Sequence, residues 1–167
     1  TYECQNLGSL EQFNYNSKKI INEIEELVFM QAKSSWNNNI HIGWSKLPIK
    51  TFNGENSIEW ANNNNKLMFD KNNSESYKYT DLVKYTPQIK ELIEKIEEKF
   101  KCTVLVARLS ELLKNHQITP HIDNGPPYFG DVTECNDIYR IHVVLKTNDL
   151  CSMMIDKEHY TLSLIHI

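Results

Sequence analysis

Apolar residues recur with helical spacing in two separate stretches of the chain. The first stretch is NSKKIINEIEELVFMQ, residues 16–31, in which Asn16 or Ser17 can cap the helix N-terminus. The second is YTPQIKELIEKIEEKF, residues 85–100, with Thr86 at the N-cap and Pro87 at the first helical position. Each pattern predicts an amphipathic helix that packs on a core through one apolar stripe. The stripes consist of Ile20, Ile24, Leu27 and Val28 in the first helix and of Ile89, Leu92, Ile93, Ile96 and Phe100 in the second.

After the second helix the pattern changes to alternating positions that are rich in β-branched residues. Residues 102–113 (CTVLVARLSELL) and 140–147 (RIHVVLKT) each predict a strand. Residues 152–162 (SMMIDKEHYTL) predict a hairpin that turns at residues 156–158. Helices first and short strands afterwards predict an α+β domain, in which the helices buttress a β half such as a barrel or a double-sheet jelly roll.

The sequence between the two helices predicts extended chain followed by a loop. Residues 36–47 show a short extended pattern, which we expect to break at Pro48. The FNGEN segment, residues 52–56, predicts a turn. The asparagines at 62–65 predict a solvated loop, because they offer no side chain that could pack in a core.

Composition limits the class of protein. The chain has 167 residues and a formal net charge of −4, with acidic and basic residues interspersed. There is no polybasic stripe, which argues against nucleic-acid binding. No apolar run approaches the roughly 20 residues that span a bilayer, and no signal-peptide pattern is present. The four cysteines are widely separated and form no Cys-x-x-Cys pair. We therefore expect a cytoplasmic protein with one domain over residues 1–161.

Both ends of the sequence have unusual features. The chain begins with Thr1 rather than methionine and closes with LSLIHI, residues 162–167. The same six residues result from translating CTGTCTCTTATACACATC, a transposon end used in preparing sequencing libraries. We expect residues 162–167 to be an adapter-derived tail on a truncated gene, and we exclude His166 from the candidate ligands for that reason. Different codons for these six residues in the coding DNA would contradict this hypothesis.

His121 and Asp123 form the first candidate pair. Residues two apart on a strand point to the same face, so these two side chains can converge on one point. Imidazole and carboxylate are two of the three ligands of the 2-His-1-carboxylate triad, which holds Fe(II) and leaves open coordination positions. Taken alone, the pair is weak evidence for a metal site, since many His-x-Asp tripeptides lie in surface turns.

Arg140 and His142 form the second pair, in YRIHVVL. In a strand with this alternation, both would lie on the face opposite Ile141, Val143 and Leu145. The planar guanidinium can hold a carboxylate through two hydrogen bonds, and the imidazole adds a donor. Open iron positions beside a carboxylate clamp describe a site for 2-oxoglutarate. The alternative is an exposed face of a sheet.

These residues resemble the aspartyl/asparaginyl β-hydroxylase-like oxygenases, which use Fe(II) and 2-oxoglutarate. The resemblance covers most of the chain and is strongest from VLVARLSELLKNHQITPHID to YRIHVVL. It implies a double-stranded β-helix fold, a jelly-roll of the cupin type. It also implies that His121 and Asp123 are iron ligands and that Arg140, His142 and Ser110 bind the cosubstrate. No catalytic residue is assigned beyond the metal ligands.

Two features depart from the family pattern. The family usually has a Pro-Gly turn before the first histidine, where this chain has LLKNHQ, residues 112–117. The second iron histidine of the family lies in a strand after the next hairpin, and the sequence stops before it. His159 comes too early for that role and is expected to lie on the surface. We expect the chain as given to be inactive in turnover.

The remaining histidines and tryptophans are assigned to structure. His116 is expected to decorate the turn before the motif, because Pro120 separates it from His121. His41 is expected to be a structural histidine in extended chain. Three aromatic residues could line a substrate cleft but more often belong to a core: Trp36, Trp44 and Trp60.

The sequence therefore predicts a dioxygenase that hydroxylates an amino-acid-type substrate, either peptidyl Asp/Asn or free proline. Such an enzyme consumes molecular oxygen and converts 2-oxoglutarate to succinate and carbon dioxide. Its substrate would be a small molecule or a peptide, with no nucleic-acid or membrane partner. One alternative is a non-catalytic cupin-like β-barrel module that binds a small carboxylate or a partner protein. Another is a zinc- or manganese-binding cupin-like protein.

Overall fold

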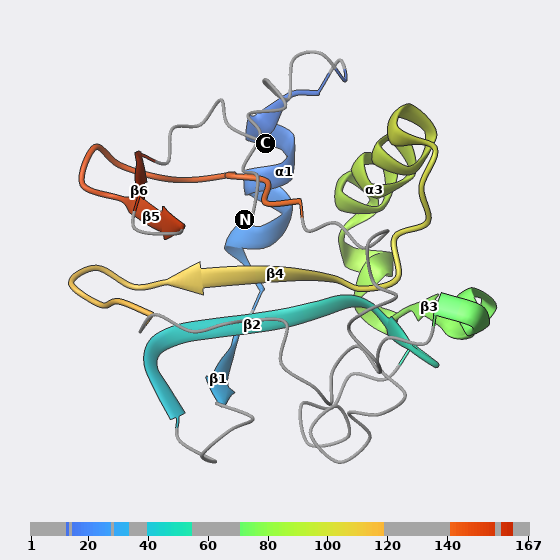
Figure 1. Ribbon diagram of the computed structural model, residues 1–167, viewed down its shortest axis with the longest axis horizontal. Coiled ribbons are helices and arrows are strands. Elements are labelled where there is room, and N and C mark those ends of the chain that lie inside the picture. The colour runs from blue at the N-terminus through green and yellow to red at the C-terminus, as the bar shows by residue number, and fades with distance from the viewer. Residues whose placement is uncertain are drawn as a thin grey trace. The chain divides into compact units, whose positions relative to one another are not determined.

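The computed structural model describes the chain in separate stretches: residues 13, 15–27, 29–33, 40–54, 71–118, 141–155 and 158–161. The residues belong to two compact units. One unit is Thr1–Glu26 with Ile138–Ile167, and the other is Leu27–Asp137. Figure 1 shows the helices and strands of both. One domain over residues 1–161 stays a prediction.

The larger unit contains an antiparallel sheet built around one long strand. This strand, β2 (Ile40–Phe52), pairs with β1 (Met30–Lys33), β3 (Tyr77–Tyr79) and β4 (Ala107–Leu112). The strand β1 lies in the stretch that was predicted as helix, so that prediction was wrong beyond Glu26. The apolar run from Leu27 to Met30 suits a strand, and pairing with β2 overrides its weak helical periodicity.

Pro48 does not break the extended chain, contrary to the prediction. The strand β2 continues through it to Phe52, and the pairing with β4 shifts register between Pro48 and Lys50. Proline has no N–H for the ladder and is tolerated at such irregular positions. Its carbonyl accepts a hydrogen bond of 2.8 Å from the hydroxyl of Thr80. Leu47 and Ile49 are buried on either side of it.

The strand β4 is shorter than the predicted strand of residues 102–113. Residues 102–106 form no strand. Instead, the backbone N–H of Val104 donates to Oε1 of Glu97 at 2.7 Å. The same oxygen accepts from Nζ of Lys50 at 3.0 Å, and both side chains are largely buried. This carboxylate ties the last turns of a helix to the segment that leads into β4.

The predicted second helix is confirmed as α3 (Pro87–Phe100), with Pro87 in its first turn. Its buried residues are Ile89, Leu92, Ile93 and Ile96. Thr86 occupies the N-cap position, but its side chain makes no capping hydrogen bond and donates to the carbonyl of Leu82 at 3.3 Å. Two short 3-10 helices, η3 (Lys71–Ser76) and η4 (Asp81–Tyr85), precede the helix and flank β3.

The smaller unit contains the helix α1 (Ser17–Glu25) and the hairpin of β5 (Ser152–Ile155) and β6 (Glu158–Thr161). Asn16 caps α1, because its side chain accepts from the N–H of Lys18 at 3.0 Å. The hairpin was predicted correctly, with Ile155 paired to Glu158. The strand predicted for residues 140–147 is not observed over residues 141–147. In the described part of this unit, β5 and β6 pair only with each other. Residues 141–147 therefore have no described strand with which to form backbone hydrogen bonds.

The described residues thus form a mixed α+β structure with two α-helices and small antiparallel sheets. They include no closed barrel, so the predicted barrel or jelly roll is not observed in this part of the chain. Neither helix in the described stretches combines the length and apolarity needed to cross a membrane.

Candidate functional site

The structure describes two of the five predicted site residues. His121, Asp123 and Arg140 lie outside the described residues, so their roles stay predictions. His142 is exposed and belongs to the smaller unit. Ser110 is exposed on β4 in the larger unit. Among the described residues, no three His, Cys, Asp or Glu side chains gather in a group that could hold a metal ion.

The surroundings of Ser110 follow from the register of β2 and β4. Lys46 pairs with Ser110, and Trp44 pairs with Leu112. Directly opposed residues of an antiparallel pair lie on the same face, as do residues two apart on one strand. Trp44, Lys46, Arg108, Ser110 and Leu112 therefore share a face of the sheet, which we call the Trp44 face. Leu47 and Leu109, paired on the other face, are both buried.

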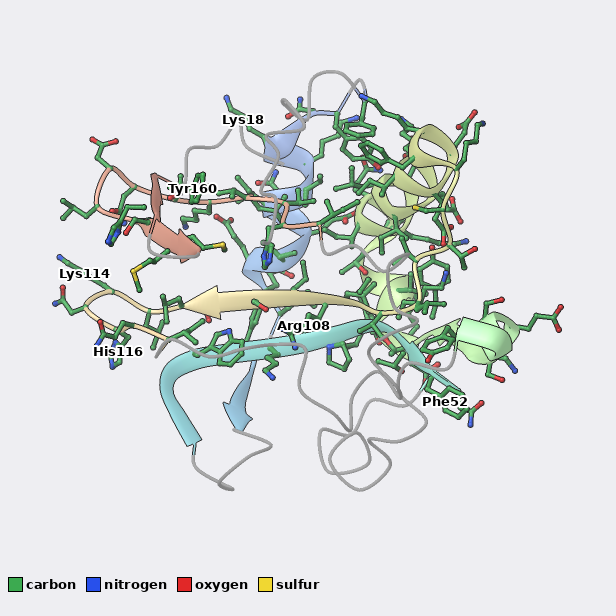
Figure 2. All side chains as sticks on the ribbon, in the orientation of Figure 1. Lys18, Phe52, Arg108, Lys114, His116 and Tyr160 are labelled. Carbon is green, nitrogen blue, oxygen red and sulfur yellow. The ribbon has the colours of Figure 1, made fainter. Side chains whose placement is uncertain are left out.

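Two cations lie over one indole on the Trp44 face. Nζ of Lys46 is 4.4 Å from the centroid of the Trp44 ring, and Cζ of Arg108 is 5.7 Å from it. These contacts help to bury Trp44, which is only 9% exposed. Burial, with a further contribution from the charge of Arg108, lowers the pKa of Lys46 from 10.5 to about 8. Figure 2 shows Arg108 part-way along the paired strands.

The lowered pKa of Lys46 predicts a pH dependence of stability. Between pH 8 and 10.5 the unfolded chain holds the Lys46 proton and the folded chain releases it, so stability rises with pH in this window. Denaturant unfolding measures the free energy of unfolding at pH 7 and pH 9.5. Between these two pH values, Lys46→Gln should gain less unfolding free energy than the parent, or lose more. Other titrating groups are common to both proteins and cancel in the comparison. Identical pH slopes would contradict the prediction.

The turn after β4 leads directly toward the His-x-Asp motif. Leu113 donates its N–H to the carbonyl of Gly43 at 2.8 Å, and Asn115 adopts a left-handed conformation with φ 62°. Asparagine tolerates this conformation better than other residues with a side chain, glycine apart. Asn115 thus helps to reverse the chain within LLKNHQ, residues 112–117. Residues 114 and 115 form the turn itself.

His116 belongs to this turn, as predicted. Its Nδ1 lies 2.9 Å from the carbonyl oxygen of Lys114, and its ring packs against the backbone of Gly43. Figure 2 shows His116 and Lys114 at the end of the loop that follows β4. Gly43 has a φ of 76°, and a Cβ there would overlap the imidazole. The glycine is therefore required both by its conformation and by the close approach of His116.

The other aromatic and imidazole candidates are placed in part. His159 is exposed on β6, paired with Met154, which confirms its surface position. His41 lies within β2, as expected for extended chain. Trp44 is buried, as expected for a core residue, and Lys46 and Arg108 lie over its ring. The candidates outside the described residues are Trp36, Trp60 and His166.

Comparison with known proteins identifies the family. The family model described as aspartyl/asparaginyl beta-hydroxylase matches residues 14–164. The chain belongs to this family. The aspartyl/asparaginyl β-hydroxylases are 2-oxoglutarate-dependent hydroxylases that typically use Fe(II). No curated protein and no solved structure matches the chain.

The sequence analysis did not bring together Lys46 and Arg108, the two cations of the Trp44 face. The alternation in GWSK and ARLS already places Trp44 with Lys46, and Arg108 with Ser110, on one face of each strand. The pairing of β2 with β4 joins distant parts of the chain, and no local pattern specifies it. The two cations come together only through that pairing.

Proposed function

We propose that this chain is part of an Fe(II)- and 2-oxoglutarate-dependent hydroxylase that acts on an amino-acid-type substrate, either peptidyl Asp/Asn or free proline. The family match over residues 14–164 carries the proposal. The side chain of Ser110 supports it, because it is exposed on β4 and its hydroxyl is accessible to a ligand.

The donor set of the His-x-Asp motif fits iron. A neutral imidazole and a carboxylate two residues apart are hard to intermediate ligands of the type that non-haem Fe(II) takes. His121 and Asp123 would hold the metal, together with a second histidine that is not assigned in this sequence. When bound, iron supplies the oxidative chemistry that inserts oxygen into a C–H bond.

The remaining residues of the proposed site bind and orient the cosubstrate. The guanidinium of Arg140 would hold one carboxylate through two parallel hydrogen bonds, with His142 as a further donor. Ser110 would donate its hydroxyl hydrogen to a carboxylate oxygen. We further propose the double-stranded β-helix fold of the family for the complete catalytic domain and a cytoplasmic location.

A second candidate is a non-catalytic module that binds a small carboxylate. The Trp44 face favours this function, because its two cations need no metal to bind an anion. The two functions differ in metal dependence. Calorimetric titration of 2-oxoglutarate into the chain, with and without Fe(II) under anaerobic conditions, separates them. Tighter binding with Fe(II) supports the hydroxylase, and metal-independent binding supports the module.

Arg140→Lys tests the cosubstrate clamp. Lysine keeps the positive charge but loses the planar fork, so the variant should bind 2-oxoglutarate roughly tenfold or more weakly. The control is Val144→Ala, which changes a partly exposed apolar side chain four residues after Arg140 in the sequence. Calorimetry on both Fe(II)-loaded variants measures the difference. Equal affinity in Arg140→Lys and the parent would show that Arg140 does not hold the cosubstrate.

A further inference from the structure

Among the described residues, the Trp44 face contains two positive charges and no carboxylate paired with either of them. The ion pairs found in the described part of the chain are Lys50–Glu97, Lys90–Glu94 and Lys95–Glu91, and none includes Lys46 or Arg108. Both cations instead lie over the ring of Trp44. Like charges this close repel each other, so the arrangement costs stability in the absence of an anion.

The position of Lys46 makes that cost larger than at an open surface. Its pKa falls to about 8 because burial and the charge of Arg108 disfavour the protonated form. Arg108 stays charged at any physiological pH. Around neutral pH both groups are therefore mainly cationic. An anion placed between them would remove the repulsion and restore the usual protonation of Lys46.

We propose that Lys46 and Arg108 bind the carboxylate of the substrate and make the enzyme select an acid over the corresponding amide. This inference rests on the proposed hydroxylase function and adds the substrate class to it. Arg108 offers a planar fork for both carboxylate oxygens, and Lys46 offers a compact charge.

Register places this carboxylate site beside the proposed cosubstrate site. Ser110 is the direct partner of Lys46 on β4, and Arg108 is two residues away on the same strand and face. A substrate carboxylate between Lys46 and Arg108 would thus lie next to a cosubstrate oxygen at Ser110. An amide offers no charge to either cation and would leave both unpaired, which is the basis of the selection. Aspartyl residues and free amino acids satisfy the site, whereas asparaginyl residues do not.

The test compares two probes that differ only in charge. N-acetyl-L-aspartate amide and N-acetyl-L-asparagine amide are titrated into the Fe(II)-loaded chain by anaerobic calorimetry, with 2-oxoglutarate at saturation. We expect the aspartyl probe to bind and the asparaginyl probe to bind at least tenfold more weakly. Lys46→Gln and Arg108→Gln should each weaken binding of the aspartyl probe roughly ten- to hundredfold, which is the effect expected for the loss of a hydrogen bond to a charged group. Both should leave 2-oxoglutarate binding unchanged.

Two further variants control for charge and folding. Lys78→Gln removes the same charge from an exposed position on β3 and should leave the aspartyl probe unaffected. Lys46→Arg keeps the charge and should retain most of the affinity. Thermal unfolding of every variant verifies that it folds.

The outcomes separate this proposal from the proposed function. The proposal is overturned if the aspartyl probe does not bind the parent, or if the asparaginyl probe binds equally well. It is also overturned if Lys78→Gln weakens binding of the aspartyl probe as much as Lys46→Gln does. The same holds if Lys46→Gln and Arg108→Gln weaken binding of 2-oxoglutarate and not binding of the probe. The hydroxylase function fails separately, if 2-oxoglutarate shows no Fe(II)-dependent binding to the parent.

Discussion

Gly43→Ala is expected to lower the free energy of unfolding by about 2–4 kcal/mol. Two effects add. Alanine at a φ of 76° is strained, and its Cβ would overlap the ring of His116. Because His116 lies in the turn that precedes His121 in the chain, we expect the displaced ring to disturb the proposed metal-binding segment as well. We therefore expect Gly43→Ala to weaken Fe(II) binding as well as stability, which denaturant unfolding and metal titration measure.

Gly54→Ala is the matched control for this prediction. Gly54 also has a positive φ, 71°, and its added Cβ would come within 2.9 Å of the carbonyl oxygen of Tyr79. It lies beyond the other end of β2, so it should lower stability without changing Fe(II) affinity. Adding His116→Ala to Gly43→Ala removes the overlap but not the backbone strain, and should recover part of the loss. Full stability of Gly43→Ala would show that neither effect operates.

Lys50→Met is expected to cost about 2–3 kcal/mol of unfolding free energy. The variant keeps the apolar length of the side chain but removes the partner of Glu97 in a largely buried ion pair of 3.0 Å. Glu97 would then keep the N–H of Val104 as its hydrogen-bond donor at 2.7 Å. A buried carboxylate that has lost its cation destabilises the folded state more than the lost attraction alone suggests.

Lys90→Met provides the comparison at an exposed site. Lys90 pairs with Glu94 at 3.5 Å on α3, and both side chains are about half exposed. Its loss should cost less than about 0.5 kcal/mol. Glu97→Gln in the Lys50→Met background should restore part of the stability, because it removes the uncompensated charge. Equal effects of Lys50→Met and Lys90→Met in urea unfolding would contradict the importance of burial.

Local patterns predicted the elements whose stability is local. The helix α3 has apolar residues at helical spacing, proline in its first turn and charged pairs four residues apart, all within fourteen residues. The hairpin of β5 and β6 likewise needs only its own two strands. These features act within the segment that contains them, so the sequence displays them directly.

The errors occurred where distant pairing decides the structure. Residues 140–147 alternate like a strand, yet residues 141–147 form none, because the alternation does not supply a partner. Pro48 reads as a break, yet β2 continues past it, since pairing to β3 and β4 holds the chain extended. The proximity of the two cations on the Trp44 face, Lys46 and Arg108, was not predicted for the same reason. The predicted iron ligands lie outside the described residues and stay predictions.

The central position of β2 has a consequence for synthesis of the chain. A ribosome releases β2 well before β4, and the two strands pair only after η4 and α3 have also emerged. Until then, Leu47 and Ile49 lack the apolar neighbours from β4, and one edge of β2 keeps unpaired N–H and C=O groups. Contacts between distant segments form slowly because loop closure must precede them. The nascent protein therefore passes through an interval in which this edge can pair with other chains, and we expect its yield in cells to depend on chaperones that bind extended apolar segments.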